Sequence, residues 1–223
     1  MLSLIDDEGF PHARAFFGFV VLTRKHIVLL AGWILAIAVG IHILLSYKGK
    51  PGNPGRPPSQ WVQNELVSHS STRPVLIMFA HPRCPCTEAT LGELEQLLAS
   101  AKSPFDATVL FYEPRGGSKT WSSSGLIKQA RSIPGVKVAF DEEANLARRF
   151  GVETSGHTLL YDTEGRLLYS GGLTGSRGHL GDNAGYAAIL SMLTNRSSQA
   201  QKNTPVFGCE LFNQCTRNLT GRN

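Results

Sequence analysis

The chain has 223 residues, enough for one domain of ordinary size with additional segments. Its formal net charge is +5, from 22 Lys and Arg against 17 Asp and Glu. The basic residues are scattered rather than clustered, which argues against a nucleic-acid partner. Four cysteines form two close pairs, Cys84/Cys86 and Cys209/Cys215, and paired cysteines suit an oxidising compartment. Neither pair has the spacing of a zinc ribbon or of covalent haem attachment.

The first segment, residues 1–25, is a short mixed tail. Residues 26–47 are predicted to form a transmembrane helix, because Ile27–Ser46 contains 20 residues without Asp, Glu, Lys or Arg. The competing interpretation is a cleaved signal peptide, but no Ala-x-Ala site follows the apolar run. The sequence therefore favours an uncleaved signal-anchor in membrane lipid. The flanking charges are nearly balanced, and the paired cysteines favour an extracytoplasmic (periplasmic) C-terminal domain.

The Gly- and Pro-rich stretch at residues 48–60 is predicted to be a linker. A domain is expected over residues 61–195, with a short helix at Trp61–Ser70 leading into it. Residues 196–223 are expected to be a polar C-terminal tail that carries one cysteine pair.

Strand and helix patterns alternate from Pro74 onward, which predicts a three-layer α/β domain. Early strands joined by helices should pair in parallel, and the late hairpin must be antiparallel, so the sheet is expected to be mixed. The expected strands are Val75–Ala80, Ala107–Tyr112, Val136–Phe140, Thr158–Tyr161 and Arg166–Tyr169. The expected helices start at Cys86, Ser118, Asp141 and Ala187.

The chemical centre of the chain is the run VLIMFAHPRCPC, at residues 75–86. An apolar strand ends in two cysteines separated by Pro85, and an amphipathic helix is predicted to begin at Cys86. The unpaired N–H groups and the dipole of a helix N-terminus stabilise negative charge, so they lower the pKa of a thiol placed there. His81 and Arg83 beside the pair are candidates to add positive charge. This pattern indicates thiol redox chemistry.

These features resemble the thioredoxin superfamily over about residues 60–195. The resemblance rests on the strand ending in a Cys-Pro-Cys site, on Asp141 to Val152, and on the hairpin that begins at His157. Within the superfamily the pieces HPRCPC, SGGLTGSRGHLGDNAG and PVFGCELF resemble the membrane-anchored bacterial RedB proteins. The resemblance implies thiol–disulfide oxidoreductase activity on protein thiols or disulfides, with a membrane electron donor as a further partner.

Two departures from the superfamily pattern affect the site. Thioredoxins have two residues between their cysteines and this chain has one, so the nucleophile is not assigned. His157 stands where thioredoxins have a cis-proline, and a trans bond is expected there because a non-proline cis bond costs about 3 kcal/mol. The predicted catalytic residues are Cys84, Cys86 and His157, where His157 would donate a proton. A disulfide between residues two apart is strained, which predicts an oxidising Cys84–Cys86 pair.

Several alternatives stay open. No cofactor is expected, but Cys84, Cys86 and His157 would also form a copper(I) site of the kind used by Sco-type carriers. A peroxiredoxin and an adaptor without turnover are further alternatives. Cys209 and Cys215 are expected to form a mutual disulfide, or else Cys209 folds back to exchange with Cys86. Arg177 and His179, in the Gly-rich loop at residues 171–185, are candidates to contact an acidic partner.

Overall fold

The computed structural model describes residues 23–116, 123–194 and 203–212. The chain divides into two compact units, residues 1–44 and residues 45–223.

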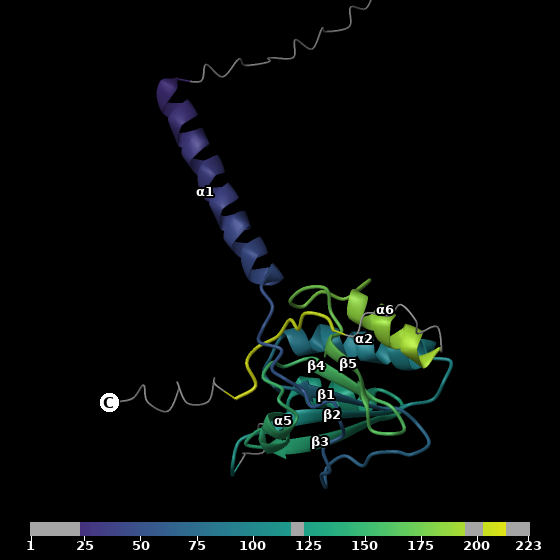
Figure 1. The fold of residues 1–223 in the computed structure, drawn as a ribbon. Coiled ribbons are helices and arrows are strands. Elements are labelled where there is room, and N and C mark those ends of the chain that lie inside the picture. Colours follow the sequence, from purple (N-terminus) through teal and green to yellow (C-terminus); the bar gives the residue numbers. More distant parts are fainter. Residues whose placement is uncertain (1–22, 117–122, 195–202, 213–223) are drawn as a thin grey trace, which may run out of the picture. The chain divides into compact units, whose positions relative to one another are not determined.

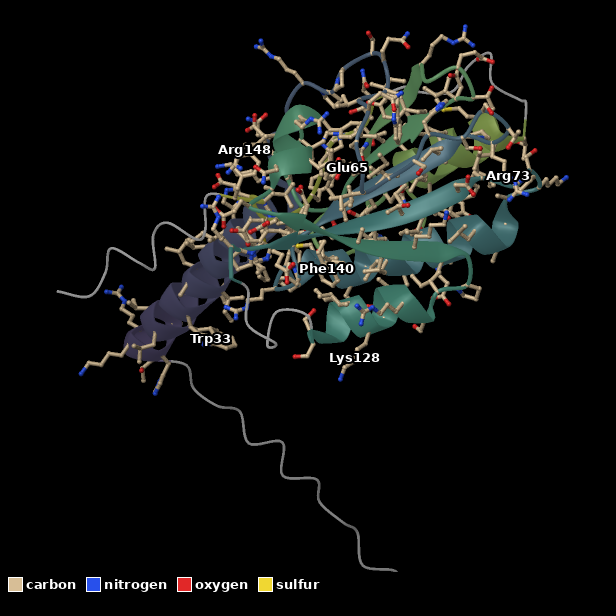
Figure 2. All side chains as sticks on the ribbon, turned by 90° about the horizontal axis from the view of Figure 1, so that it is seen from below. Trp33, Glu65, Arg73, Lys128, Phe140 and Arg148 are labelled. Carbon is tan, nitrogen blue, oxygen red and sulfur yellow. The ribbon has the colours of Figure 1, made fainter. Side chains whose placement is uncertain are left out.

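Helix α1 (Arg24–Gly49) contains the predicted membrane segment. Its 26 residues correspond to about 39 Å of α-helix, more than the ~30 Å of a bilayer core. Its mean hydropathy is 2.6 over the most apolar window, and none of its side chains is buried, as Trp33 illustrates (Figure 2). Among the described residues it is the one helix long and apolar enough to cross a membrane. The predicted apolar helix is therefore confirmed, and both an anchor and a signal segment fit it.

Five strands form the sheet of the second unit: β1 (Val75–Ala80), β2 (Asp106–Glu113), β3 (Val136–Glu142), β4 (His157–Tyr161) and β5 (Leu167–Gly172). Their order across the sheet is β3-β2-β1-β4-β5 (Figure 1). Strands β1, β2 and β3 are parallel, whereas β4 runs antiparallel to both β1 and β5. The mixed sheet and the late hairpin are as predicted. Central strand β1 is buried along its whole length, which explains its uninterrupted apolar sequence.

Within the described residues, four helices accompany the sheet: α2 (Cys86–Ser100), α4 (Gly125–Ser132), α5 (Asn145–Arg149) and α6 (Ala184–Leu193). Alternate residues of a strand face opposite sides, so β1 serves two cores. Leu76, Met78 and Ala80 share one core with apolar side chains of α2, α4 and α6. Val75, Ile77 and Phe79 share the other core with α5 and with Val67 and Leu211. Figure 1 shows α2 and α6 on one side of the sheet and α5 on the other. This is the three-layer arrangement that the sequence predicts.

Helix α5 begins later than expected, at Asn145. Its predicted cap is nevertheless present, because the Asp141 carboxylate accepts hydrogen bonds from the backbone N–H groups of Leu146 (2.7 Å) and Ala147 (2.8 Å). Ala144 adopts a left-handed conformation with φ 55°, which delays the helix start. The carboxylate thus satisfies two helix N–H groups that would otherwise be unpaired.

The segment predicted as a free spacer packs against the domain. The backbone N–H of Gly52 donates to Val206, that of Arg56 donates to Gly151, and that of Leu167 donates to Ser59. A Cβ on Gly55 would lie 1.9 Å from the Gly151 carbonyl oxygen, and Gly55 has φ +69°, so glycine is required there. Residues 61–70, predicted to be helical, are irregular. Residues 50–59 are non-helical as predicted, and their packing against the domain was not predicted. The predicted helix at residues 61–70 was wrong.

The described part of the C-terminal tail, residues 203–212, is built into the domain. Val206, Phe207 and Leu211 are buried, and Leu211 joins the core on the α5 side of the sheet. The backbone of this segment forms bridges with β5 and with residues 153–155. The expectation of a polar tail outside the core is therefore corrected for these residues.

Candidate functional site

The two predicted redox cysteines lie at the junction of β1 and α2. After β1 ends at Ala80, the backbone N–H of Cys84 donates to the His81 carbonyl oxygen (3.0 Å) and forms a turn. Pro85 occupies the N-cap position of α2, and Cys86 is its first helical residue, as predicted. The N–H of Thr87 donates to the Cys84 carbonyl oxygen (3.0 Å). This turn places the Cys84 sulfur against the start of the helix.

The sulfur of Cys84 is surrounded by hydrogen-bond donors. The backbone N–H of Cys209 donates to it at 3.4 Å. The thiol of Cys209, the hydroxyl of Thr87 and the backbone N–H of Cys86 also donate to it. These bonds, the Cys209 thiol first, outweigh desolvation and lower the pKa of Cys84 to about 4. Cys84 is therefore a thiolate at neutral pH.

Ser155 holds Thr87 in the orientation that this bond needs. Its hydroxyl oxygen accepts from the backbone N–H of His81 (2.9 Å) and lies 3.0 Å from the Thr87 hydroxyl oxygen. The Thr87 hydroxyl has one proton, and it is donated to the Cys84 sulfur. In the bond between the two hydroxyls, Ser155 is therefore the donor and Thr87 the acceptor. Ser155 lies far along the sequence, just before β4, and was not predicted as part of the site.

The other two described cysteines remain thiols. Burial, followed by the negative charge of Cys84, raises the pKa of Cys86, and Arg177 partly opposes this. The hydrogen bond from Cys209 to Cys84 raises the pKa of Cys209. None of the three described cysteines is part of a disulfide. The surroundings of the three sulfurs thus distinguish Cys84 as the thiolate.

Arg177 belongs to the surroundings of the cysteines, which the sequence did not reveal. It lies in the Gly-rich loop, and its Nη1 donates to the carbonyl oxygen of Gly208 at 2.6 Å. Its guanidinium also hydrogen bonds to the Cys86 sulfur. The loop itself is fixed to α2, since the N–H of Gly181 donates to the buried carboxylate of Glu93 (2.5 Å). Arg177 was predicted to contact an acidic partner; within the chain it contacts the carbonyl oxygens of Gly208 and Lys50, the Cys86 thiol and the Tyr47 ring.

The flanking residue His81 plays a different part from the one expected. The Nδ1 of His81 accepts from the backbone N–H of Arg83 (3.2 Å), and its ring stacks on Tyr112. Burial lowers the pKa of His81 more than the neighbouring Cys84 raises it. His81 is therefore neutral at neutral pH, and the expected positive charge is not supplied by this ring.

His157 lies inside the sheet, at the start of β4. Its Nε2 is hydrogen bonded to the Ser170 hydroxyl (2.8 Å), and its Nδ1 is buried without a partner among the described residues. Burial lowers the pKa of His157 to about 4. No hydrogen bond joins His157 to Cys84 or Cys86 in the described part of the chain. The described residues contain no cis peptide bond, so the bond before His157 is trans as predicted.

The alternative metal site is not assembled in this structure. Across residues 23–116, 123–194 and 203–212, no three His, Cys, Asp or Glu side chains are grouped so as to hold a metal ion. Cys84, Cys86 and His157 therefore do not form a ready site. Cys215 lies outside the described residues, so its predicted disulfide with Cys209 is not tested.

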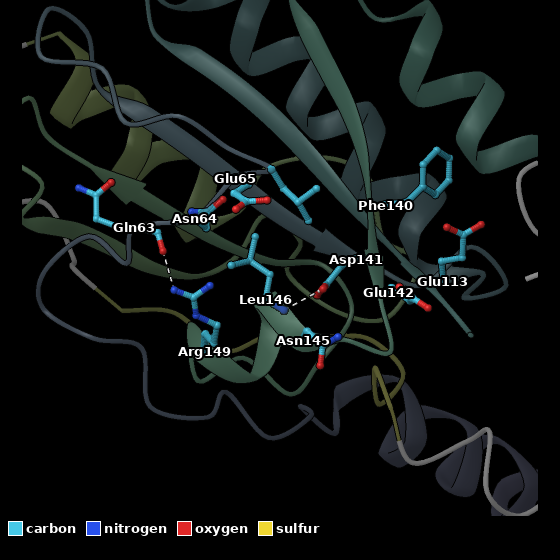
Figure 3. Close-up of a pocket in the computed structure, with 11 residues that line it drawn as sticks. Gln63, Asn64, Glu65, Glu113, Phe140, Asp141, Glu142, Asn145, Leu146 and Arg149 are labelled. Atoms are coloured by element: carbon cyan, nitrogen blue, oxygen red, sulfur yellow. Dashed lines mark hydrogen bonds between the residues drawn. The ribbon is translucent and has the colours of Figure 1, made fainter. Parts of the chain in front are cut away.

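Two cavities in the described part of the chain lie near the domain's helices, and neither is lined by Cys84. A cavity of about 850 Å³ lies over the carboxyl end of β3, where Asp141 bonds to Leu146 and Arg149 bonds to the Gln63 carbonyl (Figure 3). Its carboxylates serve helix capping or face solvent. A smaller cavity of about 310 Å³ adjoins Pro85 beside α2. Cys84 itself is only 1% exposed, beneath the segment that carries Cys209.

The strand order, the helix that starts at a cysteine after β1 and the antiparallel hairpin define a thioredoxin-like fold. No protein-family model matches the chain, and no curated protein sequence matches it. Two solved structures share the fold. One is an uncharacterized conserved protein from Geobacillus kaustophilus, with 18% identity over 74% of this chain and 90% of that chain and a TM-score of 0.53. The other is a hypothetical protein from Sinorhizobium meliloti, with 17% identity over 74% of this chain and 96% of that chain and a TM-score of 0.51. An exposed lipoprotein thioredoxin from Streptococcus pneumoniae also matches, with 20% identity over 55% of this chain and 84% of that chain and a TM-score of 0.37. The narrower resemblance to RedB stays a prediction.

Proposed function

We propose that this protein is a thiol–disulfide oxidoreductase with Cys84 as its nucleophile. The observation that carries the proposal is the set of donors around the Cys84 sulfur at the start of α2. A thiolate is the reactive form in disulfide exchange, and these donors maintain it at neutral pH. An inert structural cysteine would be buried among apolar groups, which raise the pKa of a thiol.

The reaction begins when the Cys84 thiolate attacks one sulfur of a substrate disulfide. A mixed disulfide forms, and the other substrate sulfur leaves as a thiolate. A second cysteine of the protein then attacks the Cys84 sulfur, and the substrate is released reduced. Cys86 is the partner that the sequence proposes. The two electrons come from the protein's thiols, and an external dithiol restores them.

The proposed substrates are protein thiols or disulfides on the extracytoplasmic, periplasmic side of a membrane. Residues 26–47 supply the membrane contact, and a membrane electron donor is the proposed source of reducing equivalents. Cysteines that cycle between thiol and disulfide suit that compartment, since cytosolic reductants keep most thiols reduced.

Copper(I) carriage is the competing proposal, because two close cysteines are soft ligands. His157 would have to leave Ser170 to complete the predicted set. Copper(I) titration of the reduced protein, monitored with a competing chelator, separates the two. Two results together would favour the carrier: tight copper(I) binding by the wild type that is lost in His157→Gln, and no activity of the wild type in the exchange assay.

The direct test is reduction of a model protein disulfide, such as insulin, with a dithiol as the final reductant. We expect Cys84→Ser to abolish turnover, and Ser191→Ala, a change in α6 away from the site, to leave it unchanged. An unaltered rate in Cys84→Ser would overturn the proposal.

A further inference from the structure

The segment that carries Cys209, residues 203–212, is irregular and pairs with the domain through isolated bridges and single hydrogen bonds. The N–H of Ser155 donates to the Cys209 carbonyl oxygen (2.8 Å), and the N–H of Leu211 donates to the Glu153 carbonyl oxygen (2.9 Å). Thr154 and Glu210 form an antiparallel bridge between these bonds. The backbone of residues 153–155 therefore fixes the register that brings Cys209 to Cys84.

Gly208, the residue before Cys209, allows the segment to pack closely against residues 153–155. A Cβ on Gly208 would lie 1.9 Å from the Ser155 carbonyl oxygen, so no other residue fits without moving the segment. The carbonyl oxygen of Gly208 accepts from Arg177, which also contacts Cys86. Buried Val206 and Leu211 anchor the segment on either side. These hydrogen bonds and buried side chains together hold the segment against the site.

The same segment covers the nucleophile. Cys84 is 1% exposed, and the Cys209 backbone N–H and thiol both point at its sulfur. A substrate disulfide can reach Cys84 only when the segment moves aside. When the segment returns, it brings the Cys209 sulfur back to Cys84.

From this geometry we propose that Cys209 is the resolving cysteine, so that the oxidised protein contains a Cys84–Cys209 disulfide. The inference rests on the proposed function and names the second thiol of that reaction. It differs from the predicted exchange of Cys209 with Cys86, because Cys84 is the sulfur that Cys209 contacts.

The resolving step balances as follows. The Cys209 thiol loses its proton and attacks the Cys84 sulfur of the mixed disulfide. The bond between Cys84 and the substrate breaks, the Cys84–Cys209 bond forms, and the substrate thiolate takes up the proton. Cys84 and Cys209 are oxidised together by two electrons, and the substrate disulfide is reduced by the same two. A dithiol reductant then reduces the Cys84–Cys209 bond. Cys209 is free of the tight ring that a Cys84–Cys86 bond requires.

The test traps and maps the disulfides of the full-length protein in detergent. Reduced protein is mixed with a small disulfide substrate, quenched with acid and alkylated, and its linkages are read by peptide mass spectrometry. We expect a Cys84–Cys209 link in the wild type. We expect Cys209→Ser to accumulate the Cys84–substrate mixed disulfide, with resolution at least roughly tenfold slower because an intramolecular thiol acts at about millimolar or higher concentration.

Two further variants make the result decisive. Cys215→Ser is the matched control and should resolve like the wild type. Gly208→Ala keeps all cysteines but displaces the segment, so its mixed disulfide should also persist. If Cys86→Ser rather than Cys209→Ser traps the mixed disulfide, or if Cys209 is found linked only to Cys215, the inference fails while the proposed function stands. If no mixed disulfide forms on Cys84 in any variant, the proposed function itself fails.

Discussion

The backbone N–H of Cys209 donates to the Sγ of Cys84 across 3.4 Å, although 125 positions separate the two residues in the chain. Thr87, Cys86 and the Cys209 thiol add their own donors to the same sulfur. The Cys84 thiolate is therefore stabilised from two directions, by the start of α2 and by the C-terminal segment. This double support distinguishes the site from one that a helix N-terminus makes alone.

The first prediction concerns the thiolate itself. In the reduced protein, one thiol should titrate near pH 4, because the donors around Cys84 lower its pKa to about 4. Thiolate absorbance followed against pH measures this transition. It should vanish in Cys84→Ser and persist in Cys86→Ser. In Cys209→Ala, which has no side-chain donor, it should move to higher pH, since the largest contribution to the shift comes from the Cys209 thiol. A low transition that survives in Cys84→Ser would refute the assignment.

The second prediction is an oxidising disulfide. A stabilised thiolate favours the reduced protein, so the reduction potential should lie above thioredoxin's, which is about −270 mV. Equilibration with glutathione buffers of graded ratio, followed by alkylation and mass analysis, gives the value. The Cys209→Ser variant serves as the comparison, because it leaves Cys84 and Cys86 as its pair near the helix. A wild-type potential at or below that of thioredoxin would contradict this reasoning.

The third prediction separates the two roles of Arg177. Its guanidinium lowers the pKa of Cys86 and holds the Gly208 carbonyl. In Arg177→Gln, Cys86 should be alkylated more slowly at neutral pH, because less of it is thiolate. Cys84 should be alkylated faster, because its covering segment is loosened. Arg73→Gln, at an exposed position before β1, is the control for lost charge. Equal changes of one sign at both cysteines would show that Arg177 does not act in this way.

The fourth prediction uses His157. Its pKa is lowered to about 4 by burial, below the ordinary value of about 6.5. The unfolded chain therefore binds more protons between these values, and the free energy of unfolding should fall as pH drops from about 6.5 towards 4. Denaturant unfolding of His157→Gln should show a shallower fall over that range than the wild type. His179→Gln, at an exposed histidine, should match the wild type.

The His157 variant also tests its predicted role as proton donor. A ring that is neutral above about pH 5 supplies no proton near neutral pH. The pH profile of exchange between about pH 6 and 8 should therefore be the same in His157→Gln and in the wild type. If the wild-type rate changes with pH in that range and the His157→Gln rate does not, His157 takes part in the reaction.

The fifth prediction tests the cap of α5. Asp141→Ala removes the acceptor of two helix N–H groups and should cost about 1–2 kcal/mol of unfolding free energy. Glu142→Ala, at the exposed neighbouring residue, should change stability by less than about 0.5 kcal/mol. Equal losses in both variants would show that the hydrogen bonds of Asp141 are not the stabilising element.

Much of the architecture follows from local sequence patterns. The continuous apolar run before the cysteines predicts the central strand, since a strand buried on both faces needs apolar side chains throughout. The start of α2 at Cys86 was likewise readable, because Pro85 suits the boundary of a helix and leucines recur at helical spacing after it. Both predictions rest on patterns among residues that are close in sequence.

The spacer at residues 51–60 shows where such patterns fail. Its glycines and prolines exclude a helix, and the sequence by itself cannot go further. Only the folded chain shows that Gly55 and Gly52 pack closely against residues around Gly151 and Thr154. Composition shows that residues 51–60 cannot form a helix. Whether they pack against the domain depends on the surface that residues far away in the sequence form.

The sequence alone determined that a cysteine pair would stand at a helix start behind a buried strand, in a mixed α/β sheet. The tertiary structure decided which sulfur is the thiolate, because Cys209 and Arg177 reach the site from distant segments. The pKa of a thiol depends on donors and charges within a few ångströms. Those neighbours are brought together by backbone pairing at Ser155 and by the close approach at Gly208, neither of which leaves a local pattern in the sequence.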